Sequence, residues 1–379
     1  MKHLKRFLSK ESIVATIFFM FLAAVSLCTI VRLVSRLDEN KALNVFASTK
    51  EDASFSDALS DMTSYEESRV NENIYWNEYF SVLGSNFQYL FTGKIESLQV
   101  SQGADGWLFY KSTSDGDSVA DFEGTKEYST EVLEKTADRL TAIDTQLSNA
   151  GVKFIFLVLP NKENVYADKV TEFEKVSDTT RTDKLVAYLR ENTDVTVVYP
   201  KEELIEAAKE YQVYYKYDTH WNNLGAYVGY QALLETLYGT KGEIDASLVK
   251  EKDAVIPDDV VDDLSTMIGM TWKYNDEKLI SYGDYRFPNT LDRGVWYECD
   301  NVDFQYEDSI LVIGDSFRTG MIPFFEKDFA RTRMVHRDSY DPFQLQALGP
   351  TVVVMEVVER YAGEIYDFDI NTAAETEAD

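Results

Sequence analysis

The sequence predicts an α/β sandwich with a mostly parallel sheet, preceded by one N-terminal transmembrane helix. Three observations predict this fold class: apolar runs of strand length, stretches with helical periodicity between them, and a 19-residue uncharged run near the N-terminus. The strand-length runs are unbroken and do not alternate with polar residues, which is typical of strands buried on both faces of a parallel sheet.

The composition excludes several classes of protein. The 379 residues include 37 Lys and Arg, 66 Asp and Glu, two Cys and three His, for a net charge of −29. Two Cys cannot build a disulfide-rich scaffold or a Cys-rich zinc site, and three His leave little for a metal centre, so we expect no metal and no cofactor. Strong acidity argues against nucleic-acid binding, because phosphate contacts need clustered Lys and Arg.

The uncharged run covers residues 13–31 and follows four basic residues. As a helix it spans roughly 28 Å at 1.5 Å per residue, which matches the hydrocarbon core of a bilayer. The basic flank favours a cytoplasmic N-terminus, so the acidic body is expected outside the cell. A cleaved signal peptide is the alternative, but no small-x-small cleavage site ends the run. We therefore expect a single-pass protein of the cell membrane.

The domain plan follows from these features. We expect a cytoplasmic head at 1–12, a transmembrane signal-anchor at 13–34, a juxtamembrane spacer with helices at 35–95, an α/β domain at 96–370 and a disordered acidic tail at 371–379. Charge divides along the same plan, with a net of +5 in residues 1–36 and −34 in residues 37–379.

Strand and helix patterns alternate through the α/β domain. A D–G turn leads into an apolar strand that ends at Tyr110, and a helix-period stretch follows at 129–150 and stops at Gly151. The run at 152–159 is closed by Pro160 and predicts a buried strand. The later elements are a helix at 180–191, a strand at 195–200, helices at 202–211 and 225–239, an irregular acidic stretch at 250–305, and strands at 309–313 and 350–361. The alternation of strands and helices along the chain favours a mostly parallel sheet.

Active sites in open parallel sheets gather at the carboxyl ends of strands. Ser316 follows one such strand in GDSF, where its hydroxyl can point outward while backbone N–H groups face a bound oxyanion. A plain turn or a helix N-cap is the alternative interpretation. Asn161 follows another strand and could donate its side-chain N–H to an oxyanion, or could simply be a turn residue.

A serine nucleophile needs a base and a carboxylate that orients it. Asp218 and His220, in YDTHWN, stand close enough in the sequence to be that pair. The alternative is a surface loop whose Asp218 and Asn222 cap the next helix. Beyond the basic head there are only two histidines, and His336 lies among charged residues, which makes it the weaker candidate base.

Five segments, in this order, resemble the alginate O-acetyltransferase AlgX/AlgJ-like family and the DHHW-type bacterial surface proteins, within the SGNH hydrolase-like superfamily. They are GADGWLFY (103–110), LPNKENVY (159–166), YDTHWNNLGAYVGY (217–230), ILVIGDSF (310–317) and VVVMEVVERY (352–361). The resemblance covers about residues 96–362. Thr219 departs from the pattern, because DHHW proteins have their first His there.

The resemblance implies an SGNH-like three-layer sandwich with a circularly permuted motif order. It implies a catalytic triad in which Ser316 is the nucleophile, His220 the general base and Asp218 its orienting carboxylate. We add Gly314 and Asn161 as candidate oxyanion supports. Candidate substrate contacts are Trp221 and Trp296, which could stack on sugars or fill the core, together with Arg318.

The family transfers acetyl groups to exopolysaccharide or cell-wall sugars, so the resemblance implies a glycan acceptor and a multispanning membrane O-acyltransferase as the partner that delivers the acetyl group. An esterase or deacetylase with the same triad, and a non-catalytic glycan-binding scaffold, stay open as alternatives. The exterior acidity favours a neutral or cationic glycan, because it would repel a polyanion such as alginate. We expect Ser316 Oγ within about 4 Å of a ring nitrogen of His220.

Overall fold

The computed structural model describes residues 86–371 apart from 87–88, 91, 96, 114, 254–262 and 284–295. These residues belong to one compact unit, residues 85–379. The predicted head, signal-anchor and most of the spacer lie outside the described residues, as does all but the first residue of the predicted tail. In the described part of the chain, no helix has the length and apolar character needed to cross a membrane.

A six-stranded sheet forms the centre, in the order β4-β3-β10-β8-β9-β7. Its strands are β3 (Lys153–Leu159), β4 (Val197–Val198), β7 (Trp296–Asp300), β8 (Tyr306–Gly314), β9 (Phe329–His336) and β10 (Val352–Val358). Neighbouring strands pair in parallel except β7, which runs antiparallel to β9 at the edge. The sheet is therefore mixed, with the mostly parallel centre that the unbroken apolar runs predicted.

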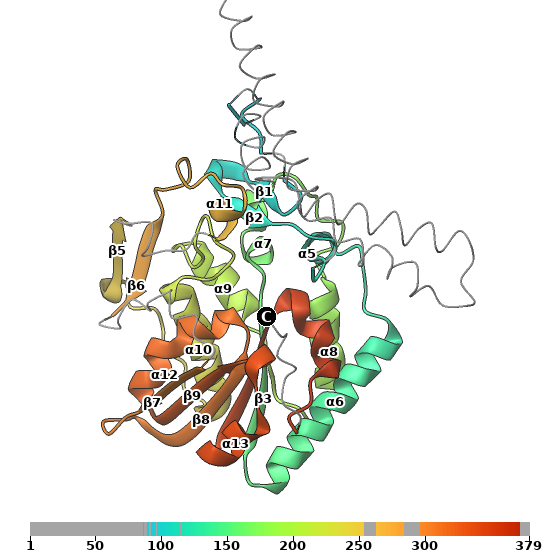
Figure 1. The fold of residues 1–379 in the computed structure, drawn as a ribbon, viewed down its shortest axis with the longest axis vertical. Coiled ribbons are helices and arrows are strands. Elements are labelled where there is room, and N and C mark those ends of the chain that lie inside the picture. Colours follow the sequence, from blue (N-terminus) through green and yellow to red (C-terminus); the bar gives the residue numbers. More distant parts are fainter. Residues whose placement is uncertain are drawn as a thin grey trace, which may run out of the picture. The chain divides into compact units, whose positions relative to one another are not determined.

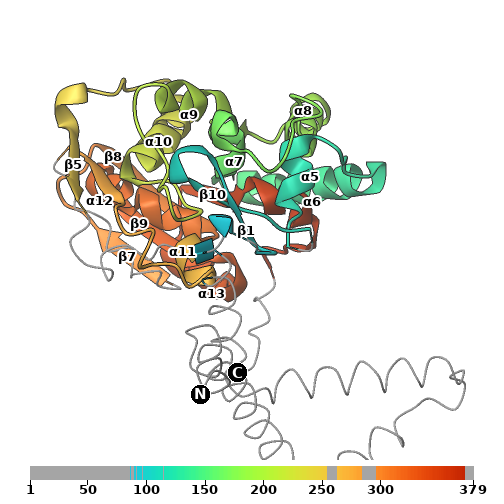
Figure 2. The same cartoon turned by 90° about the horizontal axis from the view of Figure 1, so that it is seen from above.

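Helices cover both faces of the sheet (Figure 1). One face packs on α9 (Lys201–Ala208), α10 (Asn223–Tyr238) and α12 (Ile322–Asp328), and the other on α6 (Thr130–Asn149), α8 (Arg181–Asn192) and α13 (Pro342–Leu348). Successive strand residues alternate between the two cores: Ile155 and Leu157 belong to the first, Phe154 and Phe156 to the second. Figure 2 shows the same separation from above. The result is a three-layer sandwich.

Smaller elements gather beyond the carboxyl end of β3 (Figure 1). The hairpin of β1 (Val100–Gln102) and β2 (Leu108–Tyr110) shares a small core with α11 (Asp263–Met267). The helices α5 (Ser118–Glu123) and α7 (Lys162–Val165) lie nearby. The described residues also form short 3-10 helices: η2 (Ala104–Gly106), η3 (Ala167–Lys169), η4 (Ala246–Leu248), η5 (Ser316–Met321), η6 (Arg337–Ser339) and η7 (Glu359–Asp367).

One sequence interpretation is corrected here, and one further strand is added. The stretch at 250–305 is not irregular throughout, because it contains α11, β7 and the paired strands β5 (Val249–Asp253) and β6 (Lys278–Tyr282). The charged stretch around His336 forms β9. Its Arg333 is paired with Glu298 and Asp300 across the sheet edge, so the neighbouring strand neutralises part of the charge in this stretch.

Candidate active site

The turn between β8 and η5 presents Ser316. Asp315 fixes this turn: its Oδ1 accepts the N–H of Phe317 at 2.9 Å, and its Oδ2 accepts the N–H of Val358 at 2.7 Å. The second bond ties the turn to the end of the neighbouring strand β10. Within the described residues the backbone N–H of Ser316 has no acceptor, so it is available to a ligand oxyanion.

His220 lies on a loop that ends at the start of α10. Asn222 caps this helix by accepting the N–H groups of Leu224 and Gly225, each at 3.0 Å. His220 Nε2 lies 2.6 Å from Ser316 Oγ, well inside the 4 Å expected, and His220 Nδ1 lies 2.6 Å from Asp218 Oδ1. The Nδ1–H donor to the carboxylate leaves Nε2 as the acceptor that faces the serine hydroxyl.

Asp218 is buried and has two further donors. Its Oδ1 also accepts the backbone N–H of His220 at 2.8 Å, and its Oδ2 accepts the N–H of Asp263 at 3.2 Å. Burial by itself would raise the pKa of Asp218, but the charge and hydrogen bonds of His220 outweigh it and lower the pKa. The carboxylate is therefore held ionised beside the imidazole.

Asp263 is a second carboxyl group beside this pair, and the sequence analysis missed it. It accepts the backbone N–H of Thr219 at 2.8 Å and the Thr219 hydroxyl at 2.6 Å, and lies 3.8 Å from His220 Nδ1. Burial and then repulsion from Asp218 raise its pKa. It follows a run of acidic residues, so nothing in its local sequence distinguished it from its neighbours.

The donor atoms of Asp218, His220 and Asp263 lie within 4.8 Å of one another, a separation that suits a metal ion. A metal there would compete with the hydrogen bond between His220 Nδ1 and Asp218, which already uses two of those atoms. The expectation of no metal remains a prediction. Among the described residues, this is the one group of His, Cys and carboxyl side chains close enough to bind a metal ion.

Lys162 is almost fully buried under the loop that carries Asp218. Its Nζ donates to three backbone carbonyl oxygens, those of Asp218 at 2.6 Å, Tyr215 at 3.2 Å and Lys216 at 3.3 Å. Three N–H donors thus meet three acceptors, and burial lowers the pKa of the ammonium. The side chain holds the loop against α7.

Two predicted substrate contacts are wrong because the side chains are buried. Trp221 is only 2% exposed, and its indole N–H donates to the carbonyl of Phe317 at 3.0 Å, so the ring fastens η5 to α10 and cannot stack on a sugar. Arg318 is 1% exposed, and its Nη1 donates to the carbonyl of Asp315 at 2.5 Å. Both residues support the nucleophile turn from behind.

The two predicted oxyanion supports have other contacts. A Cβ at Gly314 would collide with the carboxyl group of Glu356, so close packing requires this glycine. The Asn161 side chain donates to Asp121 Oδ2 at 3.4 Å and accepts from Arg360 Nη1 at 3.2 Å. Its amide is thus committed to these two neighbours.

The remaining candidates lie on the edge side of the sheet. Trp296 begins β7, is 37% exposed and pairs with Val335, the residue before His336. It therefore lies at the same sheet end as Gly314, which pairs with His336. His336 Nδ1 accepts the N–H of Asp338 at 3.3 Å, and burial lowers its pKa. The structure brings His220, and not His336, to Ser316.

Comparisons with known proteins agree with this architecture. A family model described as "SGNH hydrolase-like domain, acetyltransferase AlgX" matches residues 100–293, which include Asp218 and His220. The match ends before Ser316. No curated protein matches the chain.

Several solved structures resemble the chain in fold, and two of them are described here. Bacillus cereus PatB1, solved with a sulfonyl adduct, is 18% identical with a TM-score of 0.50, over 71% of this chain and 99% of that chain. A DHHW family protein from Eubacterium siraeum DSM 15702 is 15% identical with a TM-score of 0.51, over 73% of this chain and 98% of that chain. From the family match and the three-layer fold together, the chain belongs to the AlgX family of SGNH hydrolase-like acetyltransferase domains.

Proposed function

We propose that this chain is a membrane-anchored extracellular O-acetyltransferase that acts on a cell-surface or secreted polysaccharide. The observation that supports it most is the continuous chain of hydrogen bonds from Ser316 Oγ through His220 to Asp218, with 2.6 Å at each step. The description of the family supplies acetyl transfer as the reaction. The anchor at 13–34 and the extracellular location rest on the sequence alone.

In the first half-reaction, Ser316 Oγ attacks the carbonyl carbon of an acetyl donor while His220 Nε2 takes its proton. Asp218 stabilises the imidazolium that forms. The carbonyl oxygen becomes an oxyanion and accepts the free backbone N–H of Ser316. The tetrahedral intermediate then expels the leaving group, which takes the proton from His220, and an acetyl-Ser316 ester remains.

In the second half-reaction, a sugar hydroxyl gives its proton to His220 Nε2 and attacks the acetyl carbon. Ser316 leaves and recovers the proton, and the product is an acetylated glycan. If water took the place of the sugar, the same residues would make an esterase or deacetylase. The choice depends on which acceptor occupies the site and how well it excludes water. The proposed partners are therefore the glycan and a multispanning membrane O-acyltransferase that delivers the acetyl group.

The test uses the full chain in detergent with p-nitrophenyl acetate, with and without oligosaccharide acceptors. We expect a burst of one p-nitrophenol per chain, and acetyl-oligosaccharide as the product when an acceptor is present. A sulfonyl fluoride should modify Ser316, a reagent suggested by the sulfonyl adduct of PatB1. A burst with release to water alone would favour the esterase. No burst and no labelling of Ser316 would favour the non-catalytic scaffold.

A further inference from the structure

Resting on the proposed function, we propose that Arg360 forms an acceptor subsite that recognises an anionic group, a carboxylate or a phosphate, on the glycan. Arg360 follows β10 and lies in η7. Its Cζ lies 5.5 Å from the ring centre of Tyr110, 5.0 Å from that of Tyr361 and 5.9 Å from that of Phe317. Three aromatic rings thus surround one partly buried guanidinium.

The charge of Arg360 has no acidic partner among the described residues, because no carboxylate lies within 4.0 Å of it. Its Nη1 donates to the amide oxygen of Asn161, and its buried Nε has no hydrogen-bond acceptor in the described part of the chain. By contrast, the similarly enclosed Arg181 meets Asp121 at 3.3 Å. Buried cations in proteins are normally paired, so this guanidinium lacks an anion.

The carboxyl groups around Arg360 are already hydrogen-bonded elsewhere or are readily neutralised. Asp315 accepts the two backbone N–H groups that fix the nucleophile turn. Burial raises the pKa of Glu163, which favours its neutral form. Asp115 accepts the hydroxyls of Tyr110 at 2.5 Å and Tyr361 at 2.8 Å. None of them is placed to form a salt bridge with Arg360.

The surroundings hold the guanidinium in place. Asp115 bridges two of the three rings through those hydroxyl bonds. Gly116, with φ of +62°, packs so closely that a Cβ there would lie 2.8 Å from Arg360 Cβ. A positive φ and this contact both require glycine at the position. The side chain is therefore preorganised before any ligand arrives, which lowers the entropy cost of binding.

The subsite adjoins the triad. The Phe317 ring lies 5.9 Å from Arg360 Cζ and 4.7 Å, centre to centre, from the His220 ring. The cation and the base therefore lie near the same aromatic ring, which places the proposed subsite beside the triad. A planar guanidinium binds carboxylate and phosphate through paired hydrogen bonds, which identifies these anions as the ligand class.

The anion belongs to the acceptor because the acetyl group itself is neutral. This departs from the expectation of a neutral or cationic glycan, which was based on the charge of the whole exterior. At physiological salt, charges more than about 8 Å away are largely screened, so the local cation outweighs the distant acidity. The acceptor is therefore a glycan that carries few anionic groups.

Binding to the full chain carrying Ser316→Ala measures this subsite without turnover. The ligands are an oligosaccharide with one uronate, its carboxyl-reduced neutral form and a phosphate-bearing oligosaccharide. We expect the anionic ligands to bind roughly 10- to 100-fold more tightly than the neutral form, as for a hydrogen bond between charged groups. Adding Arg360→Gln should remove that preference, and Arg360→Lys should keep part of it. The anion that binds more tightly, uronate or phosphate, identifies the group that the subsite recognises.

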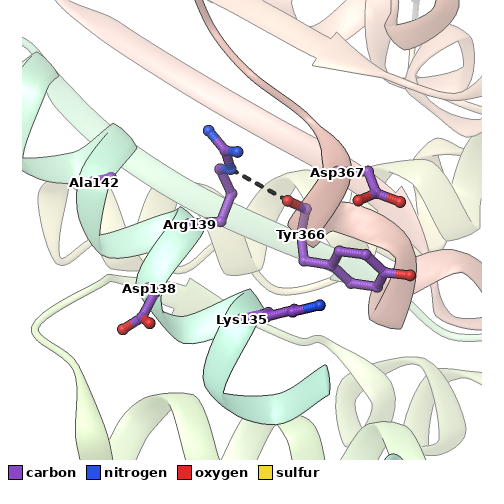
Figure 3. A pocket seen from close by; sticks show the side chains of 6 residues that line it. All are labelled: Lys135, Asp138, Arg139, Ala142, Tyr366 and Asp367. Carbon is purple, nitrogen blue, oxygen red and sulfur yellow. Dashed lines mark hydrogen bonds between the residues drawn. The ribbon is translucent and has the colours of Figure 1, made fainter. Parts of the chain in front are cut away.

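The matched control is Arg139→Gln. Arg139 lies on α6 in a separate hollow of about 420 Å³, which is lined by Lys135, Asp138 and Tyr366 among others (Figure 3). The Arg139→Gln variant should leave the preference for anionic ligands unchanged. Equal binding of charged and neutral ligands, or an equal loss of both in Arg360→Gln and Arg360→Lys, would overturn the subsite. A preference for anions in a chain with no Ser316-dependent transfer would disprove the proposed function while leaving the subsite intact.

Discussion

A buried lysine and a partly buried arginine lie beside the proposed triad, and they differ in their hydrogen-bond partners. Lys162 donates to three backbone carbonyls of the loop that carries Asp218, so its donors are saturated by the protein itself. Arg360 has one amide acceptor and no carboxylate partner among the described residues. A saturated cation positions the chain, whereas an unsaturated one is available to a ligand. Variants of these residues and their neighbours test this difference, beginning with Ser316, the proposed nucleophile.

Ser316→Ala should lower acetyl transfer by at least about 10³-fold, because the nucleophile is lost and the remaining groups act as a unit. The free energy of unfolding should change by no more than about 0.5 kcal/mol, since the hydroxyl is only partly buried. Burst kinetics and chemical denaturation measure the two effects. Retained acetyl transfer would show that Ser316 is not the nucleophile, and neither cation would then lie beside a catalytic serine.

The three triad positions could be predicted from the sequence because each lies near an identifiable strand or helix end and because histidine is scarce. The supporting residues could not. Asp263 and Lys162 meet Thr219 and Asp218 across 44 and 56 residues of the chain. Lys162 also binds backbone carbonyls, which carry no residue-type signal. The two interpretations of Trp221, sugar stacking and core filling, could not be separated for a related reason: the sequence shows an aromatic side chain but not whether it is buried.

Lys162→Met should lower kcat by roughly 10- to 100-fold and the free energy of unfolding by about 1–3 kcal/mol, because buried carbonyls lose their donors. Loss of a positive charge near Asp218 should also stabilise the His220 imidazolium. The acidic limb of the pH–rate profile should therefore move to higher pH. A merely structural role would leave that limb in place.

The matched control for this variant is Lys201→Met. Lys201 is also buried, but its Nζ meets Asp183 at 2.7 Å, away from the triad loop. It should destabilise the fold without moving the pH limb. If both lysine variants shifted the limb equally, Lys162 would have no special connection to Asp218.

Asp263→Asn should have a smaller effect, roughly 3- to 10-fold on kcat, and should move the acidic limb in the opposite direction. The carboxyl group lies 3.8 Å from His220 Nδ1, so removing its charge destabilises the imidazolium and shifts the limb to lower pH. Asparagine keeps the shape and can still accept the Thr219 N–H. Unchanged kinetics across the pH range would mean that Asp263 acts only as a neutral group, which its raised pKa would then explain.

Glu356 differs from both cations because it is a buried ionisable group that stays neutral. Its variant should have the smallest effect on activity. Neither carboxyl oxygen has a hydrogen-bond partner among the described residues, and burial with the charge of Asp315 raises the pKa well above its usual range. The folded state therefore retains a proton that the unfolded state releases at lower pH. Stability should fall as pH rises from the unfolded pKa to the folded one.

Glu356→Gln keeps the shape of the neutral acid and cannot ionise, so it should remove that pH-dependent loss. The gain in unfolding free energy over the wild type should grow with pH by about 1.4 kcal/mol per pH unit within that window. Denaturant midpoints measured at several pH values detect it, with the exposed Glu134→Gln on α6 as a control that should leave the slope unchanged. A gain independent of pH would mean that Glu356 is ionised in the fold and that Arg318 is its true partner. Arg318 would then be paired with an acid, whereas Arg360 would still have neither an acidic partner nor an acceptor for its Nε among the described residues.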